Sequence, residues 1–210
     1  MMIKWLKIIA IAAMVQITPY VAFAQEQGSG DSVCAPAAAF VQDTSNRVLQ
    51  IIKDNSNNNK ISIKLHDLFT EIVEIDWIGK FVLGSHWRTL SDEQKKQYLR
   101  QYKSFLLASY VPLFKEYNGQ SFKIESISEL ANSQCMVSMK IYTNRQNQAP
   151  YSVSYRLKHA DNKYVVRDIV AEGVSLLTTQ RAEFGAIISQ KGFDSLLQRL
   201  SAKNATNAVE

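Results

Sequence analysis

The sequence has few of the residues that build metal centres or disulfide scaffolds. Its 210 residues include only two cysteines and three histidines. Cys34 and Cys135 lie far apart, and His66, His86 and His159 do not stand at the short spacings typical of zinc ligands. We therefore expect no bound metal. In an oxidising compartment the two cysteines can pair, but the sequence does not contain the geometry that would decide this.

The sequence also lacks a glycine-rich phosphate-binding loop and any block of basic residues. Only eight glycines are present, and none forms such a loop. Lysine and arginine exceed aspartate and glutamate by five, but they are scattered instead of forming the clustered stripe typical of nucleic-acid-binding proteins. We expect no cofactor and no nucleic-acid partner, while the mild positive charge is compatible with a weak preference for anionic surfaces.

No apolar run is long enough to cross a bilayer as a helix. The run Ile8 to Val15 is far shorter than the roughly 20 residues that span about 30 Å of hydrocarbon. Lys4 and Lys7 precede it, and Ala-Phe-Ala at residues 22–24 follows it, which is the pattern of a signal peptide with its cleavage site. We predict a signal peptide over residues 1–24 and export of a soluble protein. A retained N-terminal anchor helix is the alternative.

Apolar residues recur at helical spacing in the first half of the chain. This spacing predicts helices near residues 40–52, 65–73 and 76–83, with a polar loop at 54–60. Ser91 and Gln94 form a capping-box pattern that opens a long helix rich in aromatic residues. Further positions mark helix ends or bends: Asp76 as a cap, Gly84 as the end of the short helix, Pro112 as a kink, and Asn118–Gly119 as the end of the long helix.

The period then changes from helical to alternating. Alternation predicts four antiparallel strands around residues 122–126, 135–141, 151–157 and 164–170, followed by helices over 176–188 and 193–200. The predicted fold is α+β: a layer made of a long kinked helix and shorter helices, packed on a small, strongly twisted antiparallel sheet of about four strands, with a cavity between them. We expect a disordered segment at 25–31, one domain over 32–203 and a frayed end at 204–210.

Catalytic patterns in the sequence are weak. Gly173-Val174-Ser175 resembles a nucleophile elbow, but Leu177 stands where that motif needs glycine. Ser175, His159 and Asp168 could be assembled into a triad, yet a turn or helix cap is the simpler interpretation of Ser175. Asp168 is similarly interpreted as a cap for the next helix that also pairs with an arginine. We therefore predict no catalytic residues and no enzymatic activity.

Two long motifs stand out, one at residues 76–98 with Leu-Gly and Trp-Arg pairs and one at 164–184 with the run Glu-Gly-Val-Ser. Together they resemble the MlaC family, which is also the toluene-tolerance (Ttg2-type) family of periplasmic phospholipid-binding proteins. The stretch DWIGKFVLGSHWRTLSDEQKKQY at residues 76–98 carries the family's aspartate, Leu-Gly and Trp-Arg positions. The stretch YVVRDIVAEGVSLLTTQRAEF at 164–184 carries its second signature. FLLASYVPLFKEY at 105–117 matches the aromatic run between them. Departures from the pattern include Tyr164 in place of tryptophan and TTQR where the family commonly has an asparagine, a tyrosine and the arginine.

The resemblance implies a periplasmic carrier that holds phospholipid acyl chains between the helices and the sheet. It would act as the substrate-binding component of an ABC-type lipid transport system that maintains outer-membrane lipid asymmetry. Its partners would be an inner-membrane ABC transporter with an MCE-domain subunit and an outer-membrane lipoprotein complex, and the carrier would be a monomer. An interaction or chaperone module that binds polypeptide is one alternative, and an enzyme with a helix–sheet pocket is another.

Candidate site residues follow from the expected helix–sheet slot. A lipid slot needs an apolar lining with basic groups only near its mouth, because burying a charged headgroup is costly. Core packing remains the alternative for each lining residue. The lining candidates are Phe81, Leu83, Trp87, Tyr102, Phe105, Tyr110, Val137, Met139, Tyr151, Val153, Tyr155, Val174 and Leu176. The candidates for the mouth are Arg88, Arg156 and Arg181.

Overall fold

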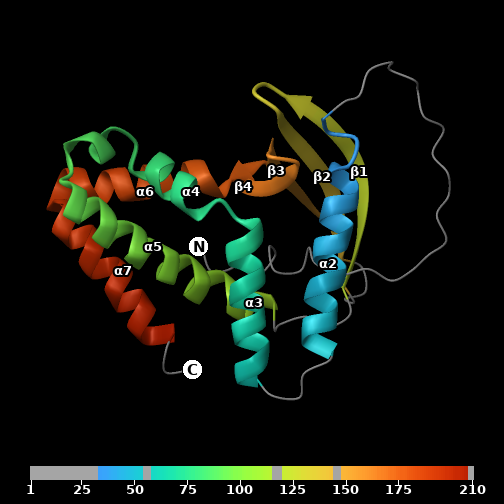
Figure 1. Ribbon diagram of the computed structural model, residues 1–210, viewed down its shortest axis with the longest axis horizontal. Coiled ribbons are helices and arrows are strands. Elements are labelled where there is room, and N and C mark those ends of the chain that lie inside the picture. Colours follow the sequence, from blue (N-terminus) through green and yellow to red (C-terminus); the bar gives the residue numbers. More distant parts are fainter. Residues whose placement is uncertain (1–32, 54–57, 115–119, 144–147, 208–210) are drawn as a thin grey trace.

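The computed structural model describes residues 33–53, 58–114, 120–143 and 148–207 (Figure 1). The predicted signal peptide, the segment 25–31 and the Asn118–Gly119 helix end lie outside these ranges. Within them the chain folds as α+β, with helices packed on one twisted antiparallel sheet, as predicted. The described part holds no helix with the length and hydropathy of a membrane span.

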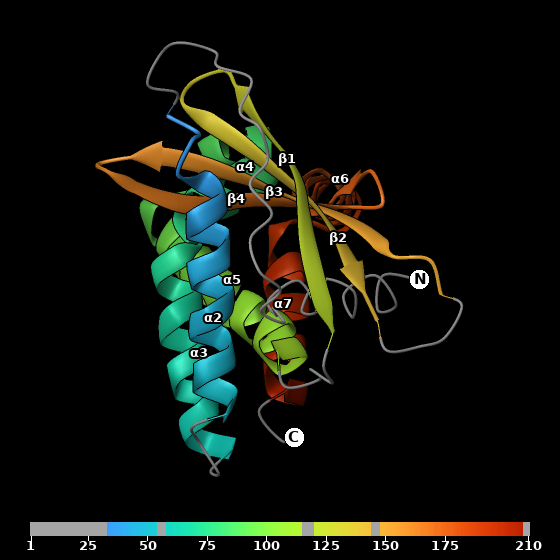
Figure 2. The same cartoon turned by 90° about the vertical axis from the view of Figure 1, so that its right-hand side faces the viewer.

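Along the sequence, one group of helices precedes the sheet and a second group follows it. Before the sheet come α2 (Ala37–Lys53), α3 (Asn58–Ile72), α4 (Ile75–Leu83), the 3-10 helix η2 (Gly84–Thr89) and α5 (Asp92–Phe114). After it come α6 (Leu176–Lys191) and α7 (Phe193–Asn207). Both views show α2 and α3 side by side (Figures 1 and 2). In Figure 1, α2 borders the sheet, and α4 to α7 gather at the opposite end of the molecule.

The sheet has five strands in the order β1-β2-β3-β4-β5. These strands are β1 (Ser121–Leu130), β2 (Gln134–Tyr142), β3 (Tyr151–Ala160), β4 (Lys163–Ala171) and the two-residue β5 (Val174–Ser175). Four of them match the prediction, and β5 adds a short edge that runs into α6. Buried and partly exposed residues alternate along β2, so that Cys135, Val137 and Met139 face the core. Most of β1 is exposed, as expected for an edge strand.

Several helix boundaries differ from the prediction, most of all the start of α3 and the end of α7. Residues 58–60 belong to α3, so the assignment of the whole stretch 54–60 to a loop was wrong for these three. Their polar composition indicated a loop, but asparagine and lysine are also compatible with the exposed first turn of a helix. Helix α7 continues past Leu200 to Asn207. The Asn204 side-chain amide donates to the Gln101 carbonyl at 3.3 Å, which holds the end of α7 against α5.

The junction between α4 and α5 follows the sequence signals closely. Gly84 ends α4 with φ 56°, and its N–H donates to the carbonyls of the preceding turn. The Ser91 N–H donates to Gln94 Oε1 at 2.9 Å, and the Gln94 N–H donates to Ser91 Oγ at 3.2 Å, which confirms the capping box. The prediction for Asp76 was wrong, because Asp76 lies in the first turn and Glu74 occupies the cap position without a side-chain cap bond.

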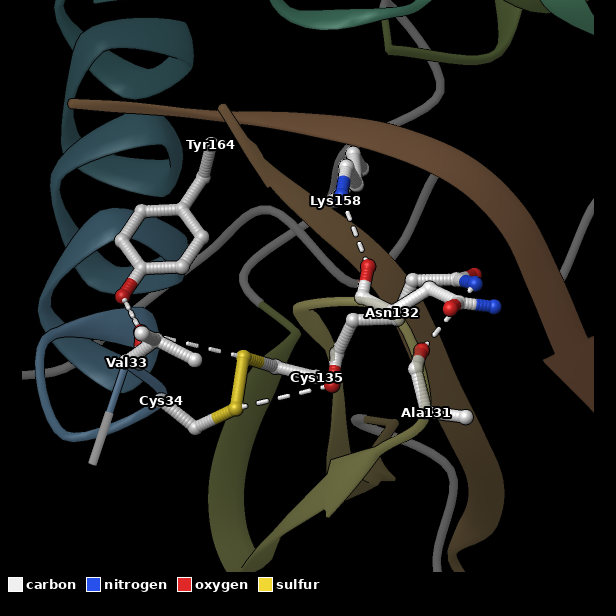
Figure 3. Close-up of a disulfide and its surroundings, with 8 residues drawn as sticks. Val33, Cys34, Ala131, Asn132, Cys135, Lys158 and Tyr164 are labelled. Atoms are coloured by element: carbon white, nitrogen blue, oxygen red, sulfur yellow. Dashed lines mark hydrogen bonds between the residues drawn. A yellow bond between two sulfur atoms is a disulfide. The ribbon is translucent and has the colours of Figure 1, made fainter. Parts of the chain in front are cut away.

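A disulfide joins Cys34 to Cys135, which settles the pairing that the sequence left open (Figure 3). It ties the segment before α2 to β2, across 101 residues of chain. The Tyr164 hydroxyl donates to the Val33 carbonyl beside it, and the Tyr164 ring packs on Phe40 at a centroid distance of 5.6 Å. The start of α2 is therefore fixed to both β2 and β4.

Three clusters of buried apolar residues form the core. The helical cluster lies among α4, α5, α6 and α7 and includes Tyr98, Tyr102 and Phe184. The sheet cluster joins the first turn of α2 to β2, β3 and β4 and contains the disulfide. The third cluster lies among α2, α3 and α5. Val73, at the end of α3, contacts all three clusters, so this residue marks the place where they meet.

Candidate functional site

An apolar cavity lies between α2, α3, the end of α5 and the middle of the sheet. It encloses about 760 Å³ of space that atoms do not fill, counting the part that opens to solvent. Its lining is Phe40, Val41, Thr44, Ser45, Val48, Leu65, Leu68, Phe69, Ile72, Val73, Tyr110, Leu113, Phe114, Tyr155, Leu157, Val166 and Ile169. We call this space the apolar cavity.

Helical spacing places the walls of the apolar cavity. On α2, Val41, Ser45 and Val48 recur at intervals of three and four residues, so they share one face of the helix. The same spacing brings Leu65, Leu68 and Ile72 to one face of α3. The one buried hydroxyl on the α2 face is satisfied internally, because Ser45 Oγ donates to the Val41 carbonyl at 2.7 Å. The lining therefore offers hydrocarbon with few free polar groups.

A second cavity adjoins the first and has a different chemistry. It encloses about 470 Å³ and lies between α4, α5, β4 and α6. Its lining is Phe69, Val73, Ile78, Tyr102, Leu106, Tyr110, Val166, Arg167, Asp168, Ile169, Leu176, Leu177 and Gln180. Five of these residues also line the apolar cavity: Phe69, Val73, Tyr110, Val166 and Ile169. We call this space the mixed cavity, since charged and amide groups stand among its apolar walls.

Buried Asp168 organises the wall of the mixed cavity. Its side chain is 4% exposed, and one carboxylate oxygen accepts from the Ser175 hydroxyl at 2.6 Å. The other oxygen accepts from the Leu177 N–H at 3.0 Å, while Ser175 Oγ accepts from the Thr178 N–H at 3.0 Å. Asp168 and Ser175 together satisfy free N–H groups in the first turn of α6. This confirms the interpretation of both residues as helix caps.

Arg167 is held in place by a partner that the sequence did not indicate. Its guanidinium forms a two-pronged ion pair with Glu74, and one of the two hydrogen bonds measures 3.1 Å. It also stacks over the Trp77 ring, with 4.3 Å from the guanidinium carbon to the ring centroid. The backbone supports the same junction, because the Glu74 N–H donates to the Val166 carbonyl at 3.1 Å. The α3–α4 junction is thus fastened to β4 beside both cavities.

Burial changes the acidity of the tyrosines around the cavities. Burial, and to a smaller extent the nearby negative charge of Asp168, together raise the pKa of Tyr110 to about 12. Burial also raises the pKa of Tyr102 and of Tyr155 above the ordinary value. All three phenols are therefore neutral at physiological pH and can donate a hydrogen bond. The Tyr102 hydroxyl donates to Gln180 Oε1.

The structure brings four of the thirteen lining candidates to the cavities. Tyr110 lines both cavities, Tyr155 lines the apolar cavity, and Tyr102 and Leu176 line the mixed cavity. The others lie elsewhere. Phe81, Leu83, Trp87 and Phe105 belong to the helical cluster or pack against it. Val137, Met139, Tyr151 and Val153 belong to the sheet cluster or pack against it. Val174 is 46% exposed.

The three arginines expected at the mouth line neither cavity. Arg88 is exposed on η2. The Arg181 guanidinium lies over the Phe81 ring, with 4.8 Å from its central carbon to the centroid. Arg156 stands opposite Asp168 in the β3–β4 register, but its Nε atom is buried without a hydrogen-bond partner. The basic residue that does line a cavity is Arg167, which the sequence marked only as a neighbour of Asp168.

Sequence reasoning missed most of the walls of the apolar cavity. The largest omission is the face that α2 and α3 present, from Phe40 and Val48 to Leu65 and Ile72. The helical spacing of these apolar residues was visible, but the same spacing describes an ordinary core. Gln180 was missed as well. A signal for it was available, because the resembled motif has an aromatic residue at this position and Gln180 is polar.

The alternative catalytic arrangement is not assembled. Ser175 and Asp168 do contact each other, but the His159 ring packs on Tyr164 at 4.8 Å, at the opposite end of β4. Within the described residues, no group of three or more histidine, cysteine, aspartate or glutamate side chains is placed to hold a metal ion. The polar groups of the mixed cavity act instead as caps and ion pairs.

Comparisons with known proteins agree with this architecture. The chain is 26% identical over 160 residues to the toluene tolerance protein Ttg2D of Pseudomonas putida, covering 73% of this chain and 74% of that protein. It is 24% identical over 131 residues to the intermembrane phospholipid transport system binding protein MlaC of Haemophilus influenzae, covering 61% of each.

A solved structure shares the fold. It is that of the phospholipid-binding protein from Ralstonia solanacearum in complex with a phospholipid, with a TM-score of 0.67 and 24% identity. The match covers 81% of this chain and 97% of that one. The family model described as MlaC protein matches residues 42–202. Because that match spans most of the chain, and because it agrees with the two motifs seen in the sequence, this chain belongs to the MlaC protein family.

Proposed function

We propose that this chain is a periplasmic carrier that binds phospholipid acyl chains in the apolar cavity and shuttles the lipid between the outer and inner membranes. The observation that carries the proposal is the hydrocarbon lining contributed by α2, α3, α5 and the sheet. The family and the similar proteins support it, since one of them is named for phospholipid transport and another was solved in complex with a phospholipid.

Physical chemistry explains why such a carrier is needed. Transfer of an acyl chain into water costs about 0.8 kcal/mol per methylene, so a lipid with about thirty methylenes meets a penalty on the order of 25 kcal/mol. Free diffusion across an aqueous compartment is therefore negligible. A cavity with an apolar lining removes most of this penalty, while the headgroup stays in water, where its charge is solvated.

The transport system around the carrier is part of the same proposal. The carrier would be the substrate-binding component of an ABC-type system and would act as a monomer. It would exchange lipid with an inner-membrane transporter that bears an MCE-domain subunit and with an outer-membrane lipoprotein complex. The predicted signal peptide supports a periplasmic location. No catalytic step belongs to this role, since the lipid leaves the carrier unchanged.

The alternative role as a polypeptide-binding chaperone lacks a surface to support it in the described ranges. The large apolar side chains that are exposed there, Ile63, Ile127, Tyr142 and Val174, lie on four different elements. A chaperone site would need a contiguous apolar patch of several hundred Å².

Lipid extraction tests the proposal directly. The protein is purified from the periplasm without detergent and extracted with organic solvent, and the extract is analysed by mass spectrometry. Phospholipid should be recovered in a stoichiometric amount. A protein that folds but is consistently free of lipid would contradict the proposal.

A cavity-filling variant ties the bound lipid to the apolar cavity. Val73→Trp places a large ring where the two cavities meet, so it should lower the lipid content several-fold, at a stability cost of about 1–3 kcal/mol from overpacking. Ile63→Trp is the matched control, because Ile63 lies on α3, the helix that Val73 directly follows, with 60% of its surface exposed. Ile63→Trp should carry as much lipid as the natural protein. Equal lipid loss in both variants would mean that the lipid lies elsewhere.

A further inference from the structure

The mixed cavity contains polar groups whose hydrogen bonds can be followed one by one. Asp168 uses both carboxylate oxygens inside the protein, on Ser175 and on the Leu177 N–H. Arg167 is neutralised by Glu74 and stacks on Trp77. These two charged groups are therefore already engaged, and neither requires a ligand.

Two donors in the same cavity remain without a partner. Gln180 Oε1 accepts a hydrogen bond from the Tyr102 hydroxyl, so the NH₂ group of the same side chain points away from Tyr102. In the part of the chain that the structure describes, neither this NH₂ group nor the Tyr110 hydroxyl forms a hydrogen bond with the protein. Both residues line the mixed cavity. The Tyr110 ring is fixed by stacking on Phe69, at a centroid distance of 6.1 Å.

The charges around these donors decide which acceptor suits them. A phosphate needs positive charge nearby, but Arg167 is already neutralised, and the Asp168 carboxylate lines the same space and repels an anion. A neutral acceptor meets no such repulsion. A hydrocarbon chain end would leave both donors without a partner, which disfavours it in this space. The site therefore matches a neutral oxygen that accepts hydrogen bonds.

The position of the donors relative to the apolar cavity narrows the choice further. Tyr110 lines both cavities, so a ligand atom bound to its hydroxyl lies at the border of the hydrocarbon space. In a phospholipid, the neutral acceptors at the base of each acyl chain are the carbonyl oxygens of the glycerol esters. An acyl chain that enters the apolar cavity from this border would place its ester there.

We propose that the mixed cavity is an ester-recognition site, in which the Gln180 amide and the Tyr110 hydroxyl donate hydrogen bonds to acyl-ester carbonyls of the bound lipid. This inference rests on the proposed function as a phospholipid carrier. It assigns a specificity to that carrier, namely preference for ester-linked over ether-linked chains. Gln180 and Tyr110 then distinguish an ester from an ether linkage, whereas the apolar cavity selects only for the size of the acyl chain.

A pair of matched lipids tests the proposal. The protein, stripped of lipid, is incubated with vesicles containing equal amounts of phosphatidylglycerol with two ester-linked oleoyl chains and its analogue with two ether-linked oleyl chains. The lipid that it takes up is then quantified by mass spectrometry. We expect the diester to be preferred by about tenfold, the ratio that two neutral hydrogen bonds of ordinary net strength produce. Equal uptake of both lipids would overturn the ester-recognition site and leave the carrier function intact. Uptake of neither would instead contradict the carrier function.

Three variants assign the preference to the named donors. Tyr110→Phe removes one oxygen and should lower the ester preference to about threefold. Gln180→Leu combined with Tyr102→Phe removes both partners of an internal hydrogen bond, so no buried hydroxyl is left unsatisfied, and should lower it similarly. Gln190→Leu, an exposed position on the same helix, should keep the tenfold preference. If the natural preference persists in Tyr110→Phe and in the double variant, the proposal is wrong. Should the double variant fail to fold, Tyr110→Phe alone decides.

Discussion

Gly84 adopts a backbone conformation that only glycine takes readily. Its φ of 56° and ψ of −125° lie in a region where a side chain causes steric strain, and a Cβ placed there would stand 2.8 Å from Arg181 Nη2. Arginine is flexible enough to move away, so the backbone strain is the larger effect. We expect Gly84→Ala to lower the free energy of unfolding by about 1–3 kcal/mol, measured by chemical denaturation.

Gly185 provides the opposite expectation and serves as a control. It lies inside α6, and a Cβ added there would meet no atom within 4 Å. Gly185→Ala should therefore raise the free energy of unfolding by about 0.5–1 kcal/mol, through the better helix propensity of alanine. If the two substitutions had the same effect, backbone conformation would not explain the role of Gly84.

Trp87 shows that a residue of the family motif need not line a cavity. It carries the motif that indicated the family, yet it packs at the edge of the helical cluster and lines neither cavity. The ammonium groups of Lys80 and Lys95 each lie 5.7 Å from its ring centroid. Because the ring is only partly buried, we expect Trp87→Ala to cost about 1–3 kcal/mol, less than a fully buried tryptophan. Lipid content measured by extraction should not change. Lipid loss at unchanged stability would restore Trp87 as part of the lipid site.

At the scale of elements, local signals predicted the helices and strands well. The capping box at Ser91 and Gln94, the glycine at 84 and the alternation in β2 to β4 each act within a few residues, so the sequence displays them directly. The start of α3 at Asn58 was missed because its first turn is polar, with Asn59 and Lys60 exposed, and composition cannot distinguish such a turn from a loop.

The cavity walls could not be predicted in the same way. Whether an apolar helix face meets another side chain or an empty space depends on the distance between elements, and this distance is set by contacts far apart in sequence. One such contact is the ion pair between Glu74 and Arg167, and another is the disulfide between Cys34 and Cys135. The faces of α2 and α3 therefore had the same pattern in the sequence as a filled core.

The disulfide makes the position of α2 testable. It closes a loop of about a hundred residues, and restricting such a loop in the unfolded chain contributes about 4–5 kcal/mol in the chain-entropy model. We expect Cys34→Ala combined with Cys135→Ala to lower the free energy of unfolding by about 2–5 kcal/mol, measured by urea denaturation. A reducing agent should destabilise the natural protein and have no effect on the double variant. Equal stability of the two proteins would show that the disulfide contributes nothing to the free energy of unfolding.

At the scale of the whole molecule, the cavities are a consequence of three separate cores. Val73 contacts the helical, sheet and third clusters and lies where they come together. Most lining residues of both cavities belong to these clusters, so the cavities are the space left between them. The residues that line the cavities are therefore largely the same residues that stabilise the fold, as Leu65 and Leu68 of the third cluster and Tyr102 of the helical cluster show.

The buried tyrosines determine how the stability of the fold depends on alkaline pH. Burial raises the pKa of Tyr98, Tyr102, Tyr110 and Tyr155, so the folded protein keeps these four phenols protonated at a pH where the unfolded chain would lose the protons. For a phenol whose folded pKa is raised, the stability is fully present below the unfolded pKa of about 10 and falls as the pH rises above it. Each phenol lowers the free energy of unfolding by about 1.4 kcal/mol per pH unit. Four together lower it by roughly 5–6 kcal/mol per unit, until Tyr110 begins to ionise in the folded protein near pH 12.

We expect cooperative alkaline unfolding between about pH 10 and 12. The circular dichroism signal of the helices should be lost at the same pH at which ultraviolet absorbance reports tyrosinate formation in these four residues. Ionisation of all tyrosines at about pH 10 with the helical signal intact would contradict their burial.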